Sequence, residues 1–204
     1  PIVVLCNPNN PTADALPAAA LLDAAAQLRR RGGWLIVDEA FGDATPAQCV
    51  TALAGDPVAA PNLIALRSLG KFFGLAGARV GFAFGAPDKI EQLREAIGPW
   101  PLSGPARLVA RQALADTAWQ AQTRRELSAA GARLAALLAP LGEVTGCALF
   151  ATLATAHSGA LYEHLARRAI LTRHFPAHDL LRFGLSGAES EWQRLATALA
   201  DWRP

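Results

Sequence analysis

The most constraining feature of this sequence is the alternation of short apolar runs with helix-forming segments in its first third. Ile2 to Cys6 is a continuous apolar, mostly β-branched run, the pattern of a strand that is buried on both faces of a sheet. Similar runs follow at Trp34–Val37 and Leu63–Leu66. Helices are predicted between them, over Pro17–Arg31 and near Pro46–Leu53. Because parallel strands need crossovers of this kind, the alternation predicts an α/β fold with a mostly parallel sheet.

A fourth strand and a series of helices are expected after these three strands. Ala78–Phe84 follows the third strand too closely for a helical crossover, so we expect it to pair antiparallel with its neighbour. Helices are predicted over Pro87–Ile97 and from about Pro105 to Leu141, with an interruption near residues 117–122.

The pattern changes after Gly142. We predict strand 143–153, helix 159–168, strand 169–173, strand 181–185 and helix 188–202. This succession is typical of a small α+β unit. We therefore place a domain boundary near residue 118. Residues 1–118 then form the C-terminal part of a large, mostly parallel domain, and residues 119–204 form a small α+β domain.

Composition excludes several classes of protein. Hydrophobic residues make up 52% of the 204 residues and charged residues 18%, which is enough for a packed core. The net charge of +2 gives no sign of a nucleic-acid or membrane partner, and no apolar run is long enough to span a membrane. The cysteines and histidines lack the spacing of disulfide frameworks and metal sites, so we expect no metal and a cytoplasmic location.

Chemically distinctive residues follow three of the predicted strands. An Asn- and Pro-rich segment follows the first strand, Asp38 ends the second, and Lys71 lies just beyond the third. Ligands of open parallel sheets bind beyond the carboxyl ends of the strands. Each residue alone has an ordinary explanation: Asn10 in a turn, Asp38 as a helix cap, Lys71 in solvent. Together, an acid, an amide and a lysine fit a pyridine cofactor that has a phenolic oxygen.

Lysine is rare in this chain, which makes Lys71 more informative. Among 19 basic residues, only Lys71 and Lys89 are lysines. Arginine replaces lysine at a solvated position without loss. It cannot replace a lysine whose amine must become a nucleophile, because the guanidinium stays protonated.

Three motifs make the similarity to a known family specific. They are Asn7-Pro8-Asn9-Asn10-Pro11-Thr12, then Val37-Asp38-Glu39-Ala40-Phe41, then Ser68-Leu69-Gly70-Lys71-Phe72-Phe73-Gly74-Leu75-Ala76-Gly77-Ala78-Arg79-Val80-Gly81. The chain resembles the pyridoxal-phosphate-dependent aminotransferases of fold type I. Within that superfamily it is most similar to the branch of the histidinol-phosphate aminotransferases and the threonine-phosphate decarboxylases of cobalamin biosynthesis.

The resemblance implies a role for each matching residue. Lys71 matches the catalytic Schiff-base lysine, Asp38 the partner of the pyridine nitrogen, and Asn10 a donor to the phenolic oxygen. Ser68 and Arg79 match the residues that bind the cofactor phosphate. Arg182 matches the arginine that binds the substrate α-carboxylate, and Arg173 is a candidate for a substrate phosphate.

The chain also departs from the family pattern. Phe41 stands where most of these aminotransferases have a tyrosine, so the phenolic oxygen of the cofactor would lose a donor and become more basic. The glycine-rich phosphate loop and the N-terminal arm of the family are not found in residues 1–204, and the chain has no methionine. We therefore expect a C-terminal fragment that is inactive alone.

The resemblance predicts a decarboxylase of an O-phosphorylated amino acid, such as L-threonine O-3-phosphate, that works as a homodimer. The form Asp-Glu-Ala-Phe at 38–41 favours this branch, as does the segment Gly98–Pro105. An aminotransferase of the histidinol-phosphate type would use the same residues and stays open. A third alternative is the aminotransferase-like ligand-sensing domain of a regulator.

Overall fold

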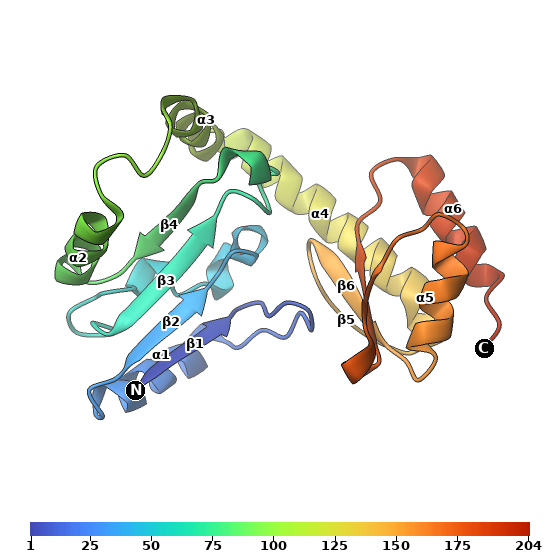
Figure 1. Ribbon diagram of the computed structural model, residues 1–204, viewed down its shortest axis with the longest axis horizontal. Coiled ribbons are helices and arrows are strands. Elements are labelled where there is room, and N and C mark those ends of the chain that lie inside the picture. The colour runs from blue at the N-terminus through green and yellow to red at the C-terminus, as the bar shows by residue number, and fades with distance from the viewer. The chain divides into compact units, whose positions relative to one another are not determined.

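The computed structural model describes residues 1–204, which divide into two compact units (Figure 1). The first unit comprises Pro1–Asn9 and Ala15–Thr123, and the second comprises Asn10–Asp14 and Arg124–Pro204. The helix α4 (Thr117–Leu138) contributes residues to both units, and the boundary that we predict near residue 118 lies in its first turn.

The first unit is built on a sheet with the strand order β1-β2-β3-β4. β1 (Ile2–Cys6), β2 (Trp34–Asp38) and β3 (Leu63–Ser68) are parallel, and β4 (Gly81–Phe84) is antiparallel to β3. The predicted parallel sheet and its antiparallel fourth strand are confirmed. β4 begins later than predicted because a 3₁₀ turn occupies residues 76–78.

One face of this sheet packs against α1 (Ala18–Arg29), which crosses over between β1 and β2. Leu21 and Ala25 of this helix are buried in one cluster with Leu35, Val37 and Leu63 of the sheet. Since side chains alternate along a strand, these sheet residues all point to the same side.

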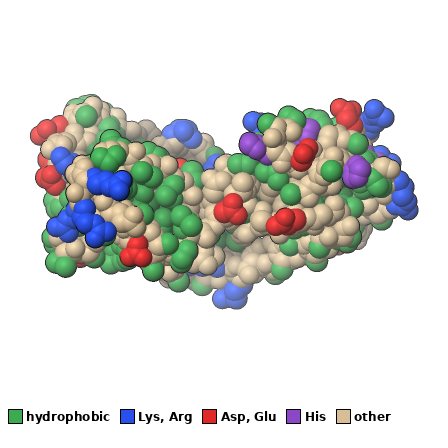
Figure 2. Space-filling view, turned by 90° about the horizontal axis from the view of Figure 1, so that it is seen from below, with side chains coloured by type: hydrophobic (Ala, Val, Ile, Leu, Met, Phe, Trp, Pro, Cys, Tyr) green, Lys and Arg blue, Asp and Glu red, His purple; other side chains and the backbone are tan.

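The prediction that β1 is buried on both faces is wrong for this chain. Ile2, Val3 and Val4 are 67%, 41% and 66% exposed. β1 is an edge strand, and hydrophobic side chains are visible over a broad part of the surface at the left of Figure 2. The strand is apolar, but within residues 1–204 it pairs with β2 alone and no strand covers its other edge.

The helix predicted near residues 46–53 is also wrong. The structure has 3₁₀ turns at Gly42–Ala44, Pro46–Gln48 and Thr51–Leu53 instead. The backbone N–H of Val50 donates to a carboxylate oxygen of Glu39 at 2.5 Å. A side chain that follows β2 thus takes a donor that a continuous helix would use for its own ladder.

The helices after β4 agree with the predictions. α2 spans Pro87–Ile97 and α3 spans Gly104–Ala115. The expected interruption lies at Asp116, where the carboxylate accepts from the N–H of Trp119 at 2.9 Å and so caps α4. Gln120 donates to the carbonyls of Ala113 and Leu114 at 3.1 Å each, which satisfies the end of α3. None of the helices is long and apolar enough to cross a membrane.

The second unit has an antiparallel sheet with helices on one face. Its strands and helices are β5 (Glu143–Cys147), β6 (Phe150–Ala154), α5 (Ser158–Ala166), β7 (Arg173–Phe175), β8 (Leu180–Gly184) and α6 (Glu189–Ala200). The strand order is β5-β6-β8-β7. The small α+β unit is present, with two corrections to its strands.

The first correction is that residues 143–153 form a hairpin rather than one strand, with Cys147 opposite Phe150. The turn residues between them, Ala148 and Leu149, are not among the residues that favour turns, so the sequence does not mark a hairpin here. The second correction is that 169–172 is not a strand, because β7 begins only at Arg173.

The two faces of this second sheet differ in chemistry. Ala151, Leu153, Leu181 and Phe183 face the helices and join their buried leucines in one core. The opposite face carries polar and charged side chains, among them Thr145, Thr152, Arg173 and Arg182, by the alternation along the paired strands.

Candidate functional site

The carboxyl edge of the first sheet brings together the predicted acid and hydroxyl. Asp38 is the last residue of β2 and Ser68 the last of β3. Asp38 pairs with Leu66, and Ser68 is two residues further along the same strand. Both side chains therefore point to the same face, the one opposite α1. The sequence placed both residues at strand ends, and the register puts them on a common side.

Asp38 is a half-buried carboxylate with neutral partners. Its Oδ1 accepts from the N–H of Ala40 at 2.9 Å. Cys6 lies opposite it in the register and hydrogen-bonds to it, and burial together with the negative charge of Asp38 raises the pKa of the Cys6 thiol. No ion pair of the chain includes Asp38. Its charge is therefore available to a cation that is not part of this chain.

Lys71 lies in the loop that leaves β3, with its side chain exposed. Its Nζ lies 5.4 Å from the centroid of the Phe41 ring, so the structure places these two predicted residues beside each other. The loop is anchored by the next two residues, Phe72 and Phe73, which are buried. Both rings contact Trp119, at centroid distances of 5.5 and 5.8 Å. An exposed amine is thereby carried on a firmly packed loop.

Ser68 and Arg79 lie at the two ends of the loop between β3 and β4. The hydroxyl of Ser68 accepts from the N–H of Gly70 at 3.1 Å, which keeps it at the start of the loop. Arg79 is exposed and donates to the carbonyl of Ala76 at 3.1 Å. Its backbone is left-handed, with φ +55°, an uncommon conformation for a residue with a Cβ. Such outliers occur often at ligand sites.

The second unit holds the other three predicted residues: Asn10, Arg173 and Arg182. Asn10 lies in the segment Asn10–Asp14, which is fixed to the polar face of the second sheet. The hydroxyls of Thr145 and Thr152 donate to backbone carbonyls of this segment, those of Thr12 and Pro11. The Arg182 guanidinium donates to Oδ1 of Asn10, which leaves the amide NH₂ of Asn10 as a donor for a ligand.

Arg173 and Arg182 lie directly opposite each other on β7 and β8. Like charges in this cross-strand position repel. Each guanidinium also lies over an aromatic ring, Phe175 at 5.7 Å for Arg173 and Phe150 at 5.4 Å for Arg182. Neither guanidinium belongs to an ion pair. Such an arrangement is suited to an anionic ligand.

The predicted site residues thus fall into two groups. Asp38, Phe41, Ser68, Lys71 and Arg79 belong to the first unit, and the remaining three belong to the second.

Sequence reasoning missed three residues that support these groups. Cys6 contacts Asp38, and Thr145 and Thr152 fix the segment of Asn10. The signal for Cys6 was present: it ends its strand as Asp38 does, and parallel strands align their ends. The threonines gave no signal, because their partners are more than 130 residues away in the sequence.

Comparison with known proteins gives consistent matches along the whole chain. The sequence model of aminotransferase class I and II matches residues 1–199. A threonine-phosphate decarboxylase of Pseudomonas aeruginosa is 47% identical over 204 residues, which cover 99% of this chain and 60% of that protein. A histidinol-phosphate aminotransferase of Mycobacterium bovis is 35% identical over 211 residues, covering 98% of this chain and 55% of that protein. The chain therefore spans between 55% and 60% of the length of these curated relatives.

A solved structure is similar over the same range. The histidinol-phosphate aminotransferase of Sinorhizobium meliloti, determined in complex with pyridoxal-5'-phosphate, superposes with a TM-score of 0.81. It is 26% identical, and the match covers 98% of this chain and 56% of that one.

Proposed function

Because this chain belongs to the class I and II aminotransferase family, we propose that it is part of a pyridoxal-phosphate-dependent decarboxylase of an O-phosphorylated amino acid. The substrate class that we propose is that of L-threonine O-3-phosphate, which loses its α-carboxylate as carbon dioxide. The 47% identity to a threonine-phosphate decarboxylase supports this choice.

The residues of the first unit fit pyridoxal phosphate. The Asp38 carboxylate has no cation partner within the chain, so it can pair with a protonated ring nitrogen. Ser68 and the exposed Arg79 offer donors to a phosphate. Lys71 offers an exposed amine, and we propose that this amine would hold the cofactor at its aldehyde group. When bound, pyridoxal phosphate supplies an electron sink for the electron pair left when a bond at the substrate α-carbon breaks.

The opposed arginines of β7 and β8 are the observation that carries the substrate class. A substrate with a carboxylate and a phosphate presents two anionic groups, and Arg173 and Arg182 present two guanidiniums side by side in the register. We propose that Arg182 binds the carboxylate and Arg173 the phosphate, each through charge-assisted hydrogen bonds. Arg182 also holds Asn10 through its Oδ1, which keeps the amide NH₂ as a donor.

The exposed amine of Lys71 has a second proposed task. After carbon dioxide has left, the α-carbon needs a proton, and an amine on a well-packed loop can hold and deliver one. The Phe41 ring beside it adds no hydroxyl that could compete as a proton donor.

Borohydride reduction of the full-length protein with pyridoxal phosphate, followed by peptide mapping, tests the central assignment. We expect the cofactor to be fixed on Lys71, and Lys71→Ala to abolish the adduct. Lys89 is the matched control because its amine, engaged with Gln92 and Asp88, lies on the surface of α2. An adduct on Lys89, or its persistence in Lys71→Ala, would overturn the proposal.

An aminotransferase of the histidinol-phosphate type is the second candidate, favoured by the 35% identical relative. Histidinol phosphate carries a phosphate but no carboxylate, so it would engage one arginine of the pair. Single-turnover assays separate the two functions. Release of carbon dioxide from L-threonine O-3-phosphate supports the decarboxylase, whereas accumulation of pyridoxamine phosphate with the ketone formed from histidinol phosphate supports the aminotransferase.

We further propose a cytoplasmic homodimer. Its support is the family resemblance and the exposed apolar side chains of α2 and α3, among them Ile97 and Leu108. Sedimentation velocity of the full-length protein tests it, with a monomer at micromolar concentration as the contradicting outcome.

A further inference from the structure

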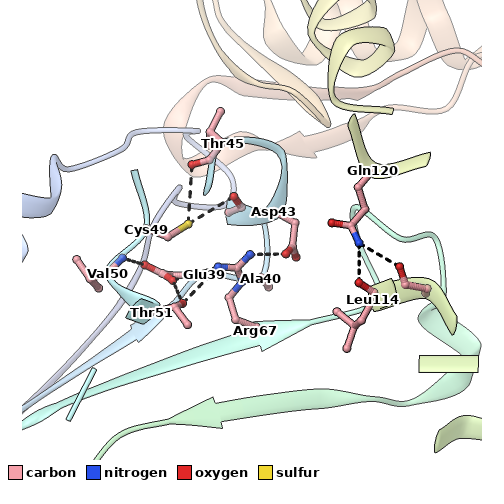
Figure 3. A network of polar contacts seen from close by, with 12 residues as sticks. Glu39, Ala40, Asp43, Thr45, Cys49, Val50, Thr51, Arg67, Leu114 and Gln120 are labelled. Atoms are coloured by element: carbon pink, nitrogen blue, oxygen red, sulfur yellow. Dashed lines mark hydrogen bonds and ion pairs between the residues drawn. The ribbon is translucent and has the colours of Figure 1, made fainter. Parts of the chain in front are cut away.

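A buried polar network lies directly behind the carboxyl edge of the first sheet (Figure 3). At its centre is Glu39, whose side chain is fully buried. One carboxylate oxygen accepts from the N–H of Val50 at 2.5 Å, and the other accepts from the hydroxyl of Thr51. Arg67 lies 3.6 Å from that second oxygen, donates to the Thr51 hydroxyl at 3.3 Å and also pairs with Asp43. Glu39 belongs to the motif at 37–41, but the proposed chemistry gives none of these residues a role.

This network contributes little to the stability of the fold. A buried ion pair gains little over well-packed apolar side chains of the same volume, because both charges lose their water. Here two carboxylates share one guanidinium, and Nε of Arg67 has no hydrogen-bond partner. Removing one member of such a group is costly, since a charge stays buried and unpaired. The network therefore fixes geometry strongly while adding little net stability.

The members of the central pair are sequence neighbours of the cofactor residues. Glu39 follows Asp38 at the end of β2, and Arg67 precedes Ser68 at the end of β3. Because side chains alternate, Arg67 lies on the face opposite Ser68. The backbone N–H of Glu39 also donates to the carbonyl of Leu66 at 2.8 Å. The ends of β2 and β3 are thus joined twice, by this backbone hydrogen bond and by the contact between the Glu39 and Arg67 side chains.

We propose that Glu39 and Arg67 are positioning residues that hold Asp38 and Ser68 in the directions required to bind the cofactor's ring nitrogen and phosphate. Their contact locks the last peptide of each strand from the side away from the ligand. Thr51 and Asp43 complete the lock by bringing the 3₁₀ turns against it. This inference rests on the proposed cofactor site.

The test uses Glu39→Gln and Arg67→Lys in the full-length protein. Gln keeps the size of Glu39 but turns an acceptor into a donor that faces Arg67. Lys keeps the charge of Arg67 but loses the planar fork that reaches both Thr51 and Asp43. We expect each variant to bind pyridoxal phosphate about tenfold more weakly. We also expect the pH titration of the bound cofactor's visible absorbance to shift, because Asp38 faces the ring nitrogen.

Asn62→Ala is the matched control for a purely structural effect. Asn62 is buried at the other end of β3 and donates to the carbonyls of Ala25 and Gly33 at 2.9 and 2.8 Å. Its loss should lower the urea midpoint but leave the titration unchanged. If Asn62→Ala weakens cofactor binding as much as Glu39→Gln, or if both network variants bind normally, the positioning role is wrong.

Lys71→Ala separates this inference from the proposed function. If that variant loses the visible absorbance while Glu39→Gln and Arg67→Lys behave as wild type, the cofactor site stands and the positioning role falls. If Lys71→Ala keeps the wild-type absorbance, the cofactor site itself is wrong, and the inference falls with it.

Discussion

At the scale of single residues, the arginines of β7 and β8 allow the sharpest prediction. Arg182→Lys keeps the charge but loses the bidentate fork that matches a carboxylate, and it also loses the geometry of the bond to Asn10. We expect about a tenfold to hundredfold rise in KM for L-threonine O-3-phosphate. Arg173→Lys should raise the KM less, since lysine also binds phosphate well as a point charge.

Steady-state kinetics with the phosphorylated substrate and with L-threonine measure this difference. The unphosphorylated substrate should be insensitive to Arg173→Lys but sensitive to Arg182→Lys. Equal loss for both substrates in Arg173→Lys would contradict the assignment of Arg173 to the phosphate.

At the scale of elements, a close approach between two backbone segments controls how the first unit packs. Gly55 has φ +78°, and a Cβ at this position would lie 2.1 Å from the backbone N of Ala86, just before α2. Gly55→Ala should therefore lower the free energy of unfolding by about 2 to 4 kcal/mol. Urea denaturation of the full-length protein measures it. Gly104→Ala is the control, because nothing lies within 4 Å of its added Cβ, and a midpoint lowered equally by both would refute the clash.

The same scale shows how far sequence patterns reach. Continuous apolar runs predict the positions of β1, β2 and β3 well, although β1 is exposed at the edge of its sheet. The hairpin of β5 and β6 is missed, since Ala148 and Leu149 turn without Gly or Asn. The 3₁₀ turns before β3 are missed because the side chain of Glu39, 11 residues earlier, accepts from the N–H of Val50. A local sequence pattern fails to predict backbone conformation where a side chain outside the segment bonds to its backbone.

For the candidate site, the motif residues were predictable and their support was not. Asp38 and Lys71 follow strands and could be placed from the sequence. That Cys6 contacts Asp38 depends on the register of β1 against β2, and that Asn10 contacts Arg182 depends on a segment joining the second unit. Such contacts come from tertiary structure alone.

At the scale of the whole molecule, half-buried thiols should make stability fall at alkaline pH. Burial, and then the negative charge of Glu39, raise the pKa of Cys49 from 9.0 to about 11. The pKa values of Cys6 and Cys147 are also raised, chiefly by burial. Between pH 9.0 and about 11, Cys49 has lost its proton in the unfolded chain but still binds it in the folded chain. Stability is therefore retained below the unfolded pKa and declines as the pH rises through this window.

Cys49→Ala tests this contribution. In urea denaturation of the full-length protein at a series of pH values, the variant should lose less stability than wild type between pH 9.0 and about 11. Subtracting the two curves removes the groups that titrate in both proteins. Parallel curves over that interval would show that Cys49 does not carry the effect.

The neighbouring acids at the end of β2 have a consequence for how this protein can change in evolution. Asp38, the last residue of β2, points to the sheet face where we propose that the cofactor binds, and Glu39, which follows it, points to the interior. Inserting or deleting a single residue in β2 would exchange their sides, burying the carboxylate of Asp38 and exposing that of Glu39. We therefore expect that length changes are tolerated in exposed turns such as the one around Val58, 84% exposed, and that β2 varies by substitution alone.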